Sequence, residues 1–304
     1  MALSKFLDPK YDLPFKRVFG TEKNKNILIH FLNDILGFTG VNTIQDVKFL
    51  STIMDPEIAS DKQSIVDVLC KDSYGNRHIV EMQLARDKGF EKRAQLYAAK
   101  AYSRQSGNYI DFKKVFFIAI SNSTLFPTEV EYISTHNIRD IKTNGHYLKD
   151  FQFVFIELPK FTKNRVDQLE TTVERWSFFF KYAEETTDED LRKIAEKSPI
   201  IKLAYDELDK FSWEEEDLAA YEERVLSVQK EAAIWEQRLD DASAKGREEG
   251  ILIGEERGIQ IGEEKGEKQA KVAVAKNSLK AGVSINVIAE ITGLSVDEIK
   301  ELQE

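Results

Sequence analysis

The stretch that decides the fold is residues 63–86, QSIVDVLCKDSYGNRHIVEMQLAR. Apolar and polar residues alternate over 64–71 and again over 77–84, a pattern typical of half-buried strands. Between the two runs, residues 72–76 (DSYGN) are rich in turn formers. The sequence therefore predicts a β-hairpin.

Three polar residues interrupt this apolar pattern. Asp67 lies in the first run, and Glu81 and Gln83 lie two residues apart in the second, so both point to one face of that strand. Pairing about the turn brings the acids of the two strands together. Neighbouring carboxylates repel unless a cation lies between them. Carboxylate oxygens suit Mg²⁺ or Mn²⁺, so Asp67 and Glu81 are predicted metal ligands.

Asp67 followed by Glu81-x-Gln83 resembles the active-site signature of the PD-(D/E)XK nucleases, in the D…ExQ form of the recombination-promoting nuclease (Rpn) and transposase-like branch. Residues 12–20 (DLPFKRVFG) look like the N-terminal box of that family, and residues 157–161 (ELPKF) look like a second box. The glycine-periodic tail looks like its C-terminal region. The resemblance covers nearly the whole chain.

The resemblance implies an α/β fold with a restriction-endonuclease-like core, a mixed sheet flanked by helices, followed by an α-helical C-terminal region. It also implies a Mg²⁺-dependent DNA endonuclease associated with mobile elements and recombination. Low sequence specificity is expected because no segment of the chain looks like a base reader. The catalytic residues would be Asp67, Glu81 and Gln83.

Further site residues lie outside the hairpin. Asp12 and Lys16 fall in the N-terminal box and are candidates to support the metal site or a phosphate, and Arg17 is a candidate phosphate contact. In nucleases of this class the helix after the metal strands flanks the active site, which implies that Arg93 and Tyr97 lie near the DNA.

Two other functions stay open. The general motif has Lys where this chain has Gln83, and glutamine can orient a water molecule but cannot act as a base. An inactive DNA-binding or regulatory protein that keeps the fold is therefore one alternative. The other is an interaction protein whose acidic, glycine-striped tail oligomerises or covers a nuclease face.

Composition sets limits on function. The chain has 304 residues with a net charge of −10, but residues 1–165 hold 24 Lys and Arg against 19 Asp and Glu, while the remaining 139 hold 19 against 34. The basic front part suits phosphate contact, and the acidic remainder is repelled by DNA, mimics it, or keeps the protein soluble. The single cysteine, Cys70, excludes an internal disulfide.

Metal and membrane signals are otherwise weak. The four histidines, His30, His78, His136 and His146, do not have metal-ligand spacing. No apolar run approaches the roughly 18 residues of a membrane span, and no signal-peptide core follows Met1. A cytoplasmic protein without membrane contact is expected.

The remaining elements follow from periodicity. A short and a longer helix are predicted within 11–37, and one strand over 41–54. The helix predicted over 90–105 should turn Leu96, Ala99 and Tyr102 toward the sheet. The apolar runs 114–121 and 151–158 predict buried strands, joined through helix and loop.

Four regions are predicted: a nuclease domain over 1–165, a helical acidic region over 166–245, a glycine-periodic helix or linker over 246–268, and a small helix-turn-helix-like tail over 269–304.

The tail suggests contact between proteins. Glycines recur every four residues from Gly246 to Gly266 and form a slowly drifting stripe on a helix. Such a stripe suits close approach of a second copy, which predicts a homo-oligomer, and a flexible linker is the alternative. The last helix carries Asp297, Glu298 and Glu301, which favours protein contact over base reading.

Overall fold

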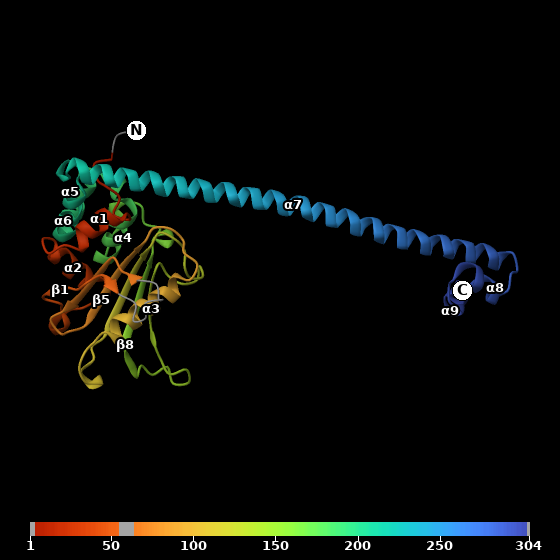
Figure 1. Cartoon of the computed structure of the whole chain (residues 1–304), viewed down its shortest axis with the longest axis horizontal. Helices are drawn as coiled ribbons and strands as arrows, with labels where there is room; N and C mark the ends of the chain where they lie inside the picture. Colours follow the sequence, from red (N-terminus) through yellow and green to blue (C-terminus); the bar gives the residue numbers. More distant parts are fainter. Residues whose placement is uncertain (1–3, 55–63, 303–304) are drawn as a thin grey trace. The chain divides into compact units, whose positions relative to one another are not determined.

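The computed structural model describes residues 4–54 and 64–302. The predicted hairpin is confirmed: β4 (Val68–Asp72) pairs antiparallel with β5 (Arg77–Gln83). It forms part of the central sheet (Figure 1).

The first strand of the hairpin is shorter than predicted. The chain leaves extended pairing at Val66 and Asp67, and the two residues before this break form β3 (Ser64–Ile65). β3 pairs with β2 (Ile53–Met54) in a separate two-stranded sheet. Asp67 therefore lies at a break between two sheets, where its backbone N–H is free to bond a side chain.

The turn of the hairpin is held by Asp72. Its Oδ1 accepts hydrogen bonds from the backbone N–H groups of Tyr74 and Asn76, both at 2.9 Å. Its Oδ2 lies 2.9 Å from Nε2 of His78, which is fully buried. Gly75 has a φ of +89°, which a residue with a Cβ adopts only at a cost.

The central sheet has six strands in the order β1-β4-β5-β6-β8-β7. β5, β6 and β8 run parallel, and the other neighbours pair antiparallel. All seven residues of β6 are buried, as the continuous apolar run predicts for an interior strand. The remaining strands are β1 (Val47–Phe49), β6 (Val115–Ser121), β7 (Ile133–Ile138) and β8 (Leu148–Glu157).

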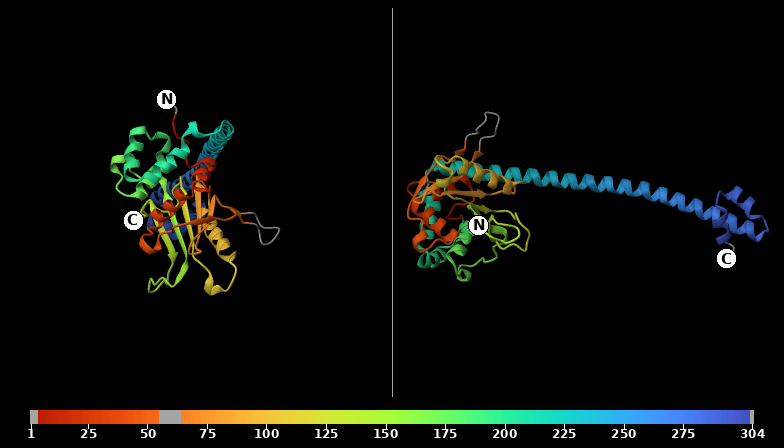
Figure 2. Two further views of the ribbon diagram at one scale, coloured as in Figure 1. Left: turned by 90° about the vertical axis from the view of Figure 1, so that its left-hand side faces the viewer. Right: turned by 90° about the horizontal axis from the view of Figure 1, so that it is seen from below.

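Helices cover both faces of this sheet, which confirms the predicted α/β core. Figures 1 and 2 show the helix drawn in gold on one face of the sheet and the helices drawn in red on the other. The first is α3 (Phe90–Ser103), and the other two are α1 (Asp12–Phe19) and α2 (Lys25–Leu36). α2 ends at Gly37, whose φ of +66° is the left-handed conformation of a helix C-terminus.

Three further helices join the core beside α1 and α2. They are α4 (Thr172–Tyr182), α5 (Asp188–Lys197) and α6 (Pro199–Leu208). Their buried aromatic residues pack with those of α1 and α2, and Nε1 of Trp176 donates to Asp34 at 2.8 Å.

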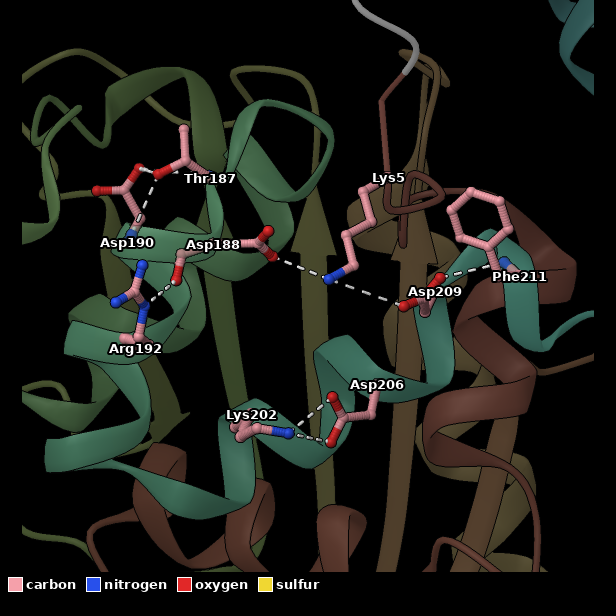
Figure 3. Close-up of polar contacts among 9 residues, drawn as sticks. All are labelled: Lys5, Thr187, Asp188, Asp190, Arg192, Lys202, Asp206, Asp209 and Phe211. Carbon is pink, nitrogen blue, oxygen red and sulfur yellow. Dashed lines mark hydrogen bonds and ion pairs between the residues drawn. The ribbon is translucent and has the colours of Figure 1, made fainter.

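The start of the chain is fastened to these helices by ion pairs. Nζ of Lys5 lies 2.8 Å from Asp188 and 3.9 Å from Asp209 (Figure 3). Phe6 also forms a β-bridge with Asp209. The N-terminal segment and the region around α6 therefore pack together.

The chain divides into two compact units, Met1–Leu226 and Ser227–Glu304. The sheet and α4 to α6 share the core of the first unit, while the division at residues 165, 245 and 268 stays a prediction. No helix in the described ranges is long and apolar enough to cross a membrane.

The second unit contains most of α7 (Glu215–Lys280), then α8 (Ile285–Thr292) and α9 (Val296–Glu301). The glycine-periodic residues are helical throughout, so they do not form an irregular linker. Ala275, Ile288 and Ile299 form a small core between the end of α7 and the last two helices.

Two predictions for the sheet were wrong. Residues 41–54 do not form one strand, because the chain leaves β1 after Phe49 and turns at Ser51 before entering β2. The helix and loop predicted between the buried strands contain β7 instead. Its pairing with β8 fixes this strand, although its apolar residues are few.

The inward face of α3 differs from the prediction in part, because Tyr102 packs against the core as expected but Leu96 and Ala99 do not. Ala94, Ala98 and Ala101 are buried against the sheet, whereas Leu96 is 50% exposed and Ala99 is exposed. Alanines on the inner face let the helix approach the strands closely. Side-chain size therefore gave a misleading signal about which face is buried.

Candidate active site

Asp67 and Glu81 meet where β4 begins. The β4–β5 register places Val68 opposite Val80, so the next pair along the hairpin is Asp67 and Glu81. The backbone N–H of Asp67 donates to Oε1 of Glu81 at 3.1 Å, and the backbone N–H of Met82 donates to Oδ2 of Asp67 at 2.8 Å. These two bonds fix both carboxylates against the strand edge.

The two carboxylates lie in a poorly solvated position. Glu81 is 6% exposed. Burial raises its pKa to about 8, and the nearby charge of Asp67 acts in the same direction. Burial also raises the pKa of Asp67, although the hydrogen bond from Met82 opposes this. A site that disfavours two negative charges favours a bound cation.

Helix α1 brings Asp12 and Lys16 to the same place. Their side chains face each other, with Nζ of Lys16 3.9 Å from Oδ2 of Asp12. The charge of Asp12 raises the pKa of both Asp67 and Glu81, and the charge of Lys16 lowers that of Asp67. The N-terminal box and the hairpin therefore contribute to one site.

Gln83 and Arg93 form the other side of the site. Oε1 of Gln83 accepts a hydrogen bond from Nη2 of Arg93, and Nε2 of Gln83 donates to the carbonyl of Ala85. The positive charge of Arg93 lowers the pKa values of Asp67 and Glu81. Gln83 thus holds the guanidinium of Arg93 beside the carboxylate pair, and one lone pair on its amide oxygen stays unused.

Tyr97 lies on α3 beside Arg93. Burial raises the pKa of its hydroxyl, and the negative charges of Glu81 and Asp67 raise it further. Tyr97 therefore remains a neutral hydroxyl close to the carboxylates over the ordinary pH range.

Arg17 is engaged elsewhere. Its Nε lies 3.4 Å from Oε2 of Glu207, its Nη2 donates to the carbonyl of Ser212 at 3.0 Å, and its guanidinium lies 4.4 Å from the ring of Trp213. The structure brings Asp12, Lys16, Arg93 and Tyr97 together with the hairpin residues, but not Arg17.

Asp87 belongs to this site and was not predicted. Its Oδ2 accepts a hydrogen bond from Nη1 of Arg93, whose guanidinium also lies 5.0 Å from the ring of Phe90. No local pattern in the sequence indicates this pair, because Asp87 and Arg93 are six positions apart and neighbouring side chains on a helix are three or four apart. Asp87 and Gln83 together fix the orientation of the Arg93 guanidinium.

The donor set fits a hard divalent cation. Asp67 and Glu81 each present a carboxylate oxygen that accepts no hydrogen bond from a described residue, and oxygen donors are what Mg²⁺ and Mn²⁺ prefer. Within residues 4–54 and 64–302 no group of three or more His, Cys, Asp or Glu is placed to hold a metal. Water and phosphate oxygens would have to complete the coordination.

Comparison with known proteins assigns most of the chain to a described family. A family model described as PD-(D/E)XK nuclease family transposase matches residues 9–236, which is three quarters of the chain. The curated proteins and the solved structures gave no match. The matched range includes every residue of the site described above.

Proposed function

Because the chain belongs to the PD-(D/E)XK nuclease family transposases, we propose that it is a divalent-metal-dependent DNA endonuclease of low sequence specificity. The observation that carries this proposal is the pairing of the buried Glu81 with the half-buried Asp67, whose pKa values are both raised. Mg²⁺ is the proposed cofactor, and Mn²⁺ the substitute.

Each site residue has a distinct proposed role. Asp67 and Glu81 hold the cation, and Asp12 adds negative charge at the site. A bound divalent cation polarises the scissile phosphate and lowers the pKa of the attacking water. Gln83 can accept a hydrogen bond from that water through the lone pair that Arg93 leaves free.

Two cations of the chain would bind the phosphate. Lys16 and Arg93 flank the carboxylate pair from α1 and α3. Neutralising the charge that develops on the phosphate stabilises the transition state. The proposed low specificity is supported by α9, which carries Asp297, Glu298 and Glu301 where a base-reading helix needs basic or amide groups.

The second candidate function is an inactive DNA-binding or regulatory protein. It is favoured by the third motif position, where Gln83 stands in place of lysine and its amide is already bonded to Arg93 and Ala85. Such a protein would keep the fold and the cations without hydrolysing DNA.

One experiment separates the two candidates. Supercoiled plasmid is incubated with the purified full chain in Mg²⁺, in Mn²⁺ and in EDTA, and binding is followed by gel shift in EDTA. Nicking in either metal that stops in EDTA supports the endonuclease. Shifted DNA bands without nicking in any metal would overturn it in favour of the inactive protein.

We also propose that the chain self-associates through α7. Ile251, Leu252 and Ile259 are each more than half exposed and fall within about 100° of one another around the helix. Each glycine from Gly246 to Gly266 has open space where a Cβ would lie, so a second helix can approach closely.

A further inference from the structure

An open, aromatic cavity lies on the face of the sheet that carries Glu81. Helix α3 packs over β5 and β6 on this face. Beyond α3, the rings of Phe151, Phe153 and Phe155 project from β8 into a cavity of about 520 Å³. Gln95 and Ala99 of α3 form the opposite wall.

This cavity and the carboxylate pair lie on opposite flanks of α3. Arg93 and Tyr97 point to the flank of Asp67 and Glu81, as their electrostatic contacts show. Gln95 and Ala99 follow Arg93 by two and six positions, which places them on the opposite side of the helix from Arg93. Both line the cavity. The buried face of α3 separates the two sites.

A second cavity lies at the N-terminus of α3, beside the aromatic cavity. It measures about 400 Å³ and is lined by Arg86, Asp87 and Lys88, and it shares Glu91 and Phe126 with the aromatic cavity. Asp87 in turn bonds Arg93 of the active site. The cavity at the N-terminus of α3 therefore adjoins the aromatic cavity on one side and, through Asp87, contacts Arg93 of the active site on the other.

We propose that the aromatic cavity binds an unpaired nucleobase of the strand being cut, so that the substrate is single-stranded or locally unwound DNA. This inference rests on the proposed function. The phosphate next to that base lies near Arg86 and Lys88. Aromatic rings bind bases of any sequence by stacking, and the amide of Gln95 is suited to a base edge.

The geometry disfavours a paired duplex that reaches from the carboxylates to the aromatic cavity. The strand has to turn around the end of one helix, which is about 10 Å across. Duplex DNA has a persistence length of about 150 base pairs and does not bend on that scale without kinking, whereas a single strand does. The apolar walls and Glu91 also suit a base better than a second phosphate.

The first test fills the cavity. Ala99 is exposed and lines it, so Ala99→Trp occupies the space without altering the core. Leu96→Trp adds the same ring on the outer side of the same helix, at a position outside the cavity. Anisotropy in EDTA is measured with a labelled 12-nucleotide single strand and with the matched duplex.

The wild type and Leu96→Trp are expected to bind the single strand about tenfold more tightly than the duplex, the size of one base–aromatic stack. Ala99→Trp is expected to lose this preference while duplex affinity stays unchanged. Equal affinities in the wild type, or an unchanged preference in Ala99→Trp, would overturn the inference. A change of oligomeric state without a change in DNA affinity would assign the cavity to a second copy instead.

The second test locates the base. 2-Aminopurine is placed at successive positions of the single strand, and its fluorescence falls where it stacks. Quenching at one position that is relieved in Phe151→Leu supports the inference, and uniform fluorescence overturns it. Nicking without single-strand preference would leave the nuclease standing and remove only the cavity's role. Cavity-dependent binding without nicking would support the role of the cavity and remove the nuclease.

Discussion

Glu81 carries a carboxylate that the folded protein solvates poorly. It is almost fully buried and faces another carboxylate, and both effects raise its pKa, to about 8 against an ordinary value of 4.5. A group with a raised pKa in the folded state binds its proton more tightly than in the unfolded state. The contribution of Glu81 to the free energy of unfolding is therefore fully present below about pH 4.5, and it is lost as the pH rises through about 8.

Glu81→Gln tests this directly, because glutamine has the same shape as the protonated acid. In EDTA at pH 8.5 the variant is expected to melt a few degrees above the wild type, and at pH 5 the two should coincide. Adding Mg²⁺ at pH 8.5 should raise the Tm of the wild type only. The exposed Glu131→Gln serves as the control with no shift at either pH. A Tm difference that does not depend on pH would contradict a raised pKa of Glu81 beside Asp67.

Some site residues could be predicted from sequence and others could not. Asp67 and Glu81 interrupt apolar strand runs, so their position in a hairpin already implied that they meet. Asp87 lies outside any periodic pattern, and its role appears only once Arg93 is placed. The engagement of Arg17 by Glu207 joins residues 190 positions apart, which no local pattern indicates.

At the scale of elements, the β4–β5 hairpin depends on the polar contacts at its turn. Asp72 accepts four hydrogen bonds, from Tyr74, from the backbone and side chain of Asn76, and from His78. Burial alone would raise the pKa of Asp72, but these hydrogen bonds outweigh that effect, so the pKa is lowered. The hairpin in turn sets the register that brings Asp67 to Glu81.

Asp72→Ala should therefore destabilise the first unit by about 3 kcal/mol, because the buried His78 and the donors of the turn lose their acceptor. Urea unfolding measures this, and Asp111→Ala, at an exposed acid in the same unit, is the control, with an effect within about 0.5 kcal/mol. A loss below about 1 kcal/mol would show that the apolar pairing alone holds the hairpin.

Elements were predictable where period and burial agree. The two helices within residues 11–37, the hairpin and the buried strand β6 follow from clear apolar patterns. β7 was missed because an edge strand with few buried residues takes its conformation from its neighbour β8. The inner face of α3 was misjudged because alanines, rather than the larger Leu96, lie against the sheet.

At the scale of the whole molecule, the motif resemblance to the PD-(D/E)XK nucleases is confirmed by the family match over residues 9–236. That match ends inside α7, so the glycine-periodic repeat and the last two helices lie beyond it. The sequence indicated a helix or a linker there, and a helix of 66 residues is what the structure contains. The spacing of the glycines does not indicate which partner covers the exposed apolar residues of α7.

Self-association of the full chain tests the proposed role of α7. Sedimentation velocity is expected to show a dimer or larger species for the wild type, and a monomer for the double variant Ile251→Glu, Ile259→Glu. Charges on this face oppose close helix packing. Gln260→Glu, between the same repeats, is the matched control. A monomeric wild type, or an oligomer that persists in the double variant, would rule the contact out.

We propose that Asp67 and Glu81 together form the metal-binding centre of a nuclease. The most direct measurement is the rate of Mg²⁺-dependent plasmid nicking by Asp67→Asn and by Glu81→Gln, beside the exposed control Glu131→Gln, with folding checked by circular dichroism. Both site variants are predicted to lose activity by about a hundredfold or more while the control keeps the wild-type rate. Wild-type nicking by either folded site variant would contradict the claim.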